Sequence, residues 1–236
     1  MLWIYHRWFR RALLFFLGGI ACLWLSSVSG WAPVHGVAVS AQPAQVSDLS
    51  EQGLQAYRVN RFLEAIAIWE QVLSTAQSPQ QRVILHTNLG QAYRQVGQPD
   101  RAINQWEAAI KLYREKLAKE SEGAIAQLLT EQAQAYSELG QHQVAVERAE
   151  LAIRLAQKHQ DRSTEAAAQG ALGSAYWALG NYDAALKANQ QSLTLACQLN
   201  SQPYIASSLN NLGNIFASRA ERFRYQATAA NLEGDT

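Results

Sequence analysis

The chain has 236 residues, of which 48% are hydrophobic and 17% are charged, with a net charge of +1. This is the composition of a folded chain, and the length allows one or two domains. A near-neutral balance argues against a broad electrostatic surface for nucleic acid or anionic lipid, so no nucleic-acid partner is expected.

Residues 1–41 have the order of an export signal. Three arginines and no acid precede an apolar or small-residue run at 12–25, and Val-Ser-Ala at 39–41 fits a signal-peptidase site. Because a membrane span needs about 20 residues, the short run favours cleavage over its alternative, an uncleaved anchor. We therefore expect an exported protein, periplasmic or secreted, that meets a membrane only through an uncleaved N-terminus.

Cleavage would leave 17 basic residues against 19 acidic residues, a net charge of −2. It would also leave Cys197 as the one remaining cysteine. No disulfide framework is then expected, and Cys197 is interpreted as a small apolar residue on a helix face.

A phrase of about 23 residues recurs along the rest of the chain. Residues 88–110 read NLGQAYRQVGQPDRAINQWEAAI, and related phrases occupy 131–153, 171–193 and, in part, 211–216. The aromatic residue of this phrase recurs after 43, 40 and 40 positions. A period of this length is typical of solenoid repeats.

Each repeat predicts two helices joined by a short turn, since apolar residues recur at helical spacing and a glycine follows the first helix. After a linker at 42–47, the expected solenoid at 48–218 has units at about 48–78, 80–120, 124–160, 164–200 and 204–218. The last unit holds a first helix only. Residues 219–236 are expected to form a degenerate last helix followed by a disordered tail.

Small and aromatic residues stand three positions apart on each first helix and therefore share a face. An alanine follows nine positions after the aromatic residue, on the second helix. Small residues let the two backbones approach, and the aromatic ring fills the space between units. The expected structural positions are Gly90, Tyr93, Ala102, Tyr136, Ala145, Gly173, Tyr176, Ala185, Gly213 and Phe216. Unit three departs from the pattern, with Ala133 in place of glycine.

This pattern resembles the tetratricopeptide repeat (TPR), and periods near 40 resemble its extended variants. The resemblance implies an all-α fold, a right-handed superhelical solenoid of antiparallel helix pairs. It also implies that a protein or peptide binds the concave face, which first helices line. Unit one departs, because its aromatic residue, Tyr57, stands one position late.

Projection of that concave face onto this chain selects mainly amide side chains. The candidate peptide-binding residues are Asn88, Gln91, Arg94, Gln134, Trp177, Asn210, Asn211 and Asn214. Amides both donate and accept hydrogen bonds, which suits the main chain of an extended peptide. With Arg94 as the only cation, a clamp for an acidic C-terminus is not expected. The alternative is that these are solvated polar positions without a ligand.

The sequence contains no motif for catalysis or metal binding. The histidines have no metal-ligand spacing, no nucleophile-elbow phrase occurs, and the glycines recur at helix turns rather than in phosphate loops. We expect no enzyme activity, no cofactor and no metal.

The leading hypothesis is an interaction scaffold outside the cytoplasm. An export signal followed by extended repeats also resembles the N-terminal region of bacterial CHAT-domain proteins, which carry a caspase-like protease domain that is absent here. The chain as the regulatory part of such a protease is one alternative, and a cell-envelope assembly factor is another.

Overall fold

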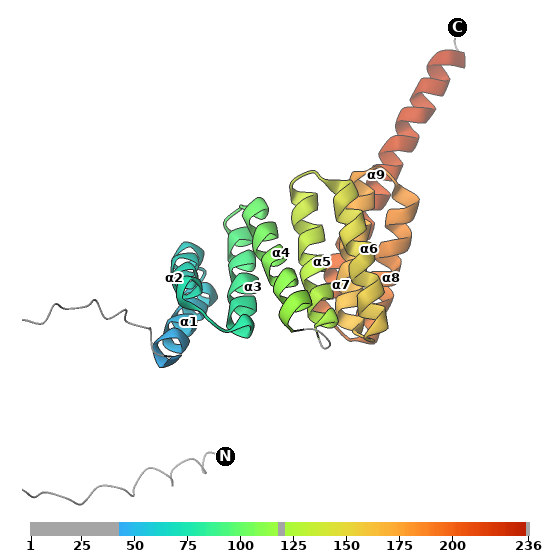
Figure 1. Ribbon diagram of the computed structural model, residues 1–236. Coiled ribbons are helices and arrows are strands. Elements are labelled where there is room, and N and C mark those ends of the chain that lie inside the picture. The colour runs from blue at the N-terminus through green and yellow to red at the C-terminus, as the bar shows by residue number, and fades with distance from the viewer. Residues whose placement is uncertain (1–42, 118–120, 235–236) are drawn as a thin grey trace, which may run out of the picture. The chain divides into compact units, whose positions relative to one another are not determined.

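The computed structural model describes residues 43–117 and 121–234, and these residues form helices and short turns without a strand (Figure 1). The expected export signal lies outside them. The helices are α1 (Pro43–Arg58), α2 (Phe62–Thr75), α3 (Pro79–Gln95), α4 (Pro99–Lys116), α5 (Glu122–Glu138), α6 (His142–Lys158), α7 (Arg162–Ala178), α8 (Tyr182–Gln198) and α9 (Gln202–Gly234).

Every helix packs against the next one along the chain, so that α1 to α8 make four pairs and α9 follows them. The first helix α7 also contacts the first helices on either side of it, α5 and α9. This arrangement confirms the predicted all-helical solenoid. Residues 43–47, which were expected to be part of a linker at 42–47, belong instead to α1, which begins at Pro43. Proline can begin a helix because the first turn does not need its missing N–H group.

The turn inside each pair uses one residue in the left-handed conformation. Its φ angle is 61° at Asn60, 73° at Gly97, 74° at Gly140 and 73° at Gly180. Glycine and asparagine tolerate this conformation, which costs other residues roughly 1–2 kcal/mol. The chain can therefore reverse after α1, α3, α5 and α7.

No such turn interrupts α9, which is one continuous helix of 33 residues. The expectation that its first part ends near residue 218 and that a separate helix follows is therefore wrong. Ala220 occupies the position that corresponds to Gly97, Gly140 and Gly180. Since alanine favours the right-handed helix, the chain does not reverse there.

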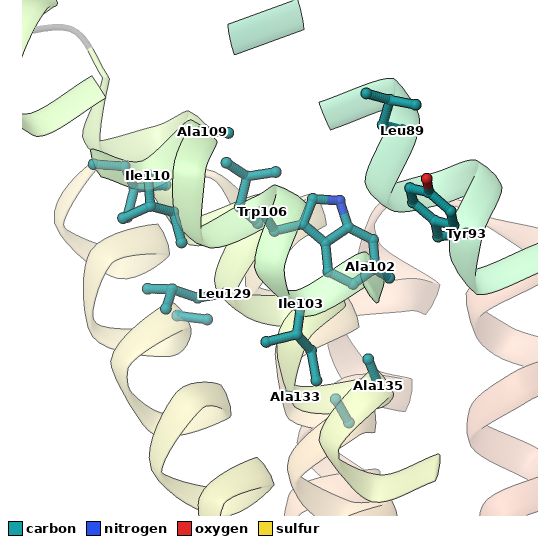
Figure 2. Close-up of a cluster of buried hydrophobic side chains, with 14 of the residues drawn as sticks. Leu89, Tyr93, Ala102, Ile103, Trp106, Ala109, Ile110, Leu129, Ala133 and Ala135 are labelled. Carbon is teal, nitrogen blue, oxygen red and sulfur yellow. The ribbon is translucent and has the colours of Figure 1, made fainter. Parts of the chain in front are cut away.

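The glycine of a first helix lies directly beneath a side chain of the second helix. A Cβ atom added to Gly90 would lie 2.2 Å from Nε1 of Trp106, and one added to Gly53 would lie 2.3 Å from Nε1 of Trp69. Figure 2 shows the Trp106 ring directed toward the helix that carries Leu89 and Tyr93. Glycine is therefore required at these two positions because the tryptophan ring of the second helix occupies the space of a Cβ atom. The spacing of the small and aromatic residues along one helix does not predict this partner.

The other two complete pairs use different partners at the same two positions. In unit four, a Cβ atom on Gly173 would lie 2.0 Å from Nδ2 of Asn189. In unit three the corresponding residues are Ala133 and Ala149, both fully buried. The missing glycine of unit three is thus matched by a small residue on its second helix, which leaves room for a methyl group.

Candidate functional site

The candidate peptide-binding residues lie on four successive first helices, and none of them is fully buried. On α3, Asn88 and Arg94 are half-buried and Gln91 is exposed. Gln134 is half-buried on α5, and Trp177 is exposed on α7. On α9, Asn211 is half-buried, whereas Asn210 and Asn214 are exposed. Because α7 contacts both α5 and α9, the last three of these helices lie next to each other in this order.

Arg94 is engaged by two carboxylates of the next unit. Its guanidinium lies 2.9 Å from a carboxylate oxygen of Glu131 and 2.8 Å from one of Glu138. Both acids belong to α5, so the arginine links α3 to α5. Its charge is balanced within the protein, and it is not a free cation for an acidic ligand.

Trp177 is held by the last helix while part of its ring stays in solvent. The indole Nε1 donates to Oγ of Ser218 at 3.0 Å, and 39% of the residue remains exposed. The hydrogen bond fixes the orientation of the ring between α7 and α9. A fixed and partly exposed aromatic face can cover an apolar side chain of a ligand.

Asn211 belongs to a polar network between α7, α8 and α9. Its Nδ2 donates to Oδ1 of Asn189 at 3.0 Å and to Oγ of Ser174 at 3.2 Å. Asn189 is fully buried, and its own Nδ2 donates to the carbonyl of Ala185 at 3.0 Å. Buried amides are costly unless they are satisfied, so Asn211 has a structural role as the partner of Asn189. Asn189 takes the tryptophan position of units one and two, and no repeated motif of the sequence marks it as a polar partner.

Five candidate side chains make no hydrogen bond or ion pair within the residues that the structure describes. They are Asn88, Gln91, Gln134, Asn210 and Asn214. Each presents an amide that can donate and accept. We call these five residues the free amide set, in contrast to Arg94, Trp177 and Asn211, which are already engaged by neighbouring helices.

Two buried titratable side chains of α3 are engaged by residues of the neighbouring helices α2 and α4. Burial and a hydrogen bond to Glu70 raise the pKa of Tyr93 to about 12. Burial lowers the pKa of His86, whose Nδ1 lies 2.7 Å from the amide oxygen of Gln105. No group of three potential metal ligands occurs in this part of the chain. Cys197 is exposed on α8.

Three family models, each described as a tetratricopeptide repeat, match the sequence at residues 50–107, 80–158 and 166–202. No curated protein matches the sequence. The matches therefore agree with the repeat pattern, and they provide no support for the resemblance to CHAT-domain proteins.

Many solved structures share the fold at low sequence identity. A putative kinesin light chain of Podosopora anserina with nearly identical TPR-like repeats has 22% identity, with 82% of this chain and 96% of that chain covered and a TM-score of 0.60. BtubC (BKLC) from P. vanneervenii has 18% identity, 78% and 82% coverage and a TM-score of 0.58.

A Rap protein complexed with competence and sporulation factor has 16% identity and a TM-score of 0.64. The match covers 76% of this chain and 50% of the Rap chain. These likenesses establish the fold alone.

Proposed function

Since the chain belongs to the tetratricopeptide-repeat family, whose fold is that of a protein–protein interaction scaffold, we propose that it binds an extended peptide segment along its first helices. The free amide set carries this proposal. Its five side chains come from α3, α5 and α9, and each leaves a donor and an acceptor without a partner in the described residues. An extended peptide offers main-chain N–H and C=O groups at regular intervals, which such amides can pair.

The electrostatics of this face favour a ligand segment without charge. Arg94, its cation, is balanced by Glu131 and Glu138. A carboxylate ligand would have to displace these acids, and a basic ligand would meet carboxylates that are already paired. The Trp177 ring supplies a partly exposed apolar surface. A peptide with uncharged residues and one apolar anchor fits these features best.

A structural neighbour offers a parallel for a binding role. The Rap protein of similar fold was solved in complex with competence and sporulation factor. A chain of similar fold can therefore hold a second molecule. The parallel supports a binding role, and the ligand of this chain is inferred only from its own side chains.

We expect the double substitution Gln134→Ala and Asn214→Ala to weaken peptide binding at least about fivefold. Each substitution removes one amide that has no partner within the protein, and the loss of one hydrogen bond corresponds to about 0.5–1.5 kcal/mol. Peptides selected from a random library on the purified protein would provide the ligand, and titration by fluorescence anisotropy would give the affinity of both proteins.

Asn104→Ala with Gln190→Ala is the matched control. These exposed polar residues lie on the second helices α4 and α8, so their loss should leave the affinity unchanged. Two outcomes would contradict binding by the first helices. Either both double variants bind the peptides equally weakly, or both bind them with the affinity of the parent protein.

We also propose that the protein acts outside the cytoplasm. The support is the charged and apolar order of residues 1–41. No helix in the described residues has the length and apolar character of a membrane span. Alkaline phosphatase fused after Thr236 should be active in a bacterial host, because this enzyme needs an oxidising compartment for its disulfides. The same fusion without residues 2–41 should be inactive, and activity of that shorter fusion would contradict export by this segment.

A further inference from the structure

Within residues 43–117 and 121–234, no helix covers one apolar face of α9. This face consists of Ala206, Leu209, Gly213, Phe216, Ala220 and Phe223, which alternate in steps of three and four residues. Such spacing places all six on one side of a helix. All six are exposed, with 53% of Leu209, 55% of Phe216 and 61% of Phe223 in solvent. We call these six residues the α9 seam.

Ala206, Leu209 and Gly213 correspond to positions that are buried in units two to four, and Phe216 corresponds to tyrosines that are buried or half-buried there. Leu129, which corresponds to Leu209, is fully buried, and Tyr93, which corresponds to Phe216, is 2% exposed. A Cβ atom on Gly90 would collide with Trp106, whereas nothing lies within 4 Å of one on Gly213. In the pairs α3–α4, α5–α6 and α7–α8, the second helix covers this face of the first helix. Because α9 continues through Ala220 without a turn, it receives no such cover from the described residues.

We propose that a second copy of this chain covers the seam, through an antiparallel pairing of the two α9 helices about a twofold axis. An antiparallel pair centred between residues 214 and 215 places Gly213 opposite Phe216 of the second copy. It also places Leu209 opposite Ala220 and Ala206 opposite Phe223. Every layer of the pair then joins one large residue to one small residue, and each contact occurs twice by symmetry.

This complementarity is a property of the antiparallel arrangement only. A parallel pair in register would set Phe216 against Phe216 and leave Gly213 against Gly213, which gives an overfilled layer beside an empty one. Overpacking and cavities both destabilise a packed seam. The order of large and small residues along α9 therefore selects one orientation.

The charges of α9 agree with the same orientation. Residues 202–218 contain no charged side chain, while Arg219, Glu221, Arg222 and Arg224 follow them. The antiparallel pair sets this charged segment opposite the uncharged segment of the second copy. In the parallel pair Arg219 of one copy would lie beside Arg224 of the other, because these two positions flank the seam, and the two like charges would repel each other.

The size of the seam predicts a weak but specific dimer. From residue 206 to residue 223 a helix extends about 26 Å, at a rise of 1.5 Å per residue. Contact along one helix face is at or below the lower end of specific interfaces, about 1,200 Å² in total. We therefore expect a dimer that forms at micromolar concentrations.

Thiol cross-linking in the full chain tests both the pairing and its direction. The parent variant carries Cys22→Ser and Cys197→Ser, which remove the native thiols. Addition of Leu209→Cys and Ala220→Cys together should give a covalent dimer in high yield with a short bis-maleimide linker. Each cysteine alone should give at least tenfold less, because its symmetry mate lies about 16 Å away along the helix axis.

The possible outcomes separate the alternatives. Efficient cross-linking of each single-cysteine variant would overturn the antiparallel arrangement in favour of a parallel one. No cross-linking of the double-cysteine variant would overturn the proposal and leave the seam to a different occupant. Circular dichroism of every variant would verify that the helices are intact.

A second measurement is independent of cysteine chemistry. Phe216→Glu adds a charge at the centre of the seam, and its exposure means that the fold of the monomer should tolerate it. We expect the dimer dissociation constant from sedimentation equilibrium to rise at least tenfold. Gln226→Glu, a charge outside the seam on the same helix, should leave it unchanged. Equal constants for all three proteins would overturn the proposal.

Discussion

Gly90→Ala is expected to lower the free energy of unfolding by more than about 3 kcal/mol, at the upper end of single-residue effects. The new methyl group would lie 2.2 Å from Nε1 of Trp106 and 2.6 Å from two of its ring carbons. Trp106 is fully buried, so its ring cannot move aside without displacing other core residues. Guanidinium unfolding followed by circular dichroism would measure the loss.

A double-mutant cycle isolates the contact from other effects of alanine. Trp106→Ala alone should cost about 3–5 kcal/mol, as for other large buried aromatic residues. Gly90→Ala added to that variant should cost nothing further or stabilise slightly, because the ring that it strikes is gone. The pair would then match Ala133 and Ala149 of unit three, which are both buried.

Gly123→Ala is the control for the effect of alanine on a helix. No atom lies within 4 Å of a Cβ added there, and alanine is favoured over glycine in a helix by about 1 kcal/mol. It should therefore be neutral or stabilising. If Gly90→Ala were as harmless as Gly123→Ala, the close approach of α3 to the Trp106 ring would be wrong.

Tyr93→Ala is expected to lower the free energy of unfolding by about 3–4 kcal/mol. Tyr93 is 2% exposed, and loss of a buried aromatic ring removes both apolar burial and packing. The ring also carries the guanidinium of Arg101 at 4.5 Å from its centre, and its hydroxyl donates to Glu70 of the preceding unit. The same unfolding experiment gives the value.

Two further substitutions divide this effect into its parts. Tyr93→Phe keeps the ring under Arg101 and removes only the hydroxyl, so it should cost about 1 kcal/mol. Tyr136→Ala should cost less than Tyr93→Ala, because Tyr136 is only partly buried between its neighbours. If Tyr136→Ala lowered the free energy of unfolding more than Tyr93→Ala, the buried fraction of the ring would not determine the size of the effect.

The helix pairs and most packing positions could be predicted from the sequence because their signals are local. Gly90 and Tyr93 share a helix face through spacing alone, and glycine after a periodic segment marks the turn. The continuation of α9 past residue 218 also has a local signal. Ala220 stands at the position where the other units carry the left-handed turn residue. The break expected near residue 218 is therefore absent from α9.

The candidate site was less predictable, because the state of each side chain depends on residues far along the chain. Arg94 is paired with acids 37 and 44 positions away, and Trp177 with a serine 41 positions away. No periodic pattern within one helix shows such a partner. Which of the candidate residues are engaged and which form the free amide set therefore follows only from the contacts between helices.

The sequence by itself determined an all-helical repeat protein, since each unit has apolar stripes that neither helix can bury alone. Only the tertiary structure decided which small residue lies beneath a ring, which polar residues are already bound, and which face of α9 lacks a cover. These properties depend on distances between helices, and such distances follow from packing rather than from the order of residues in one segment.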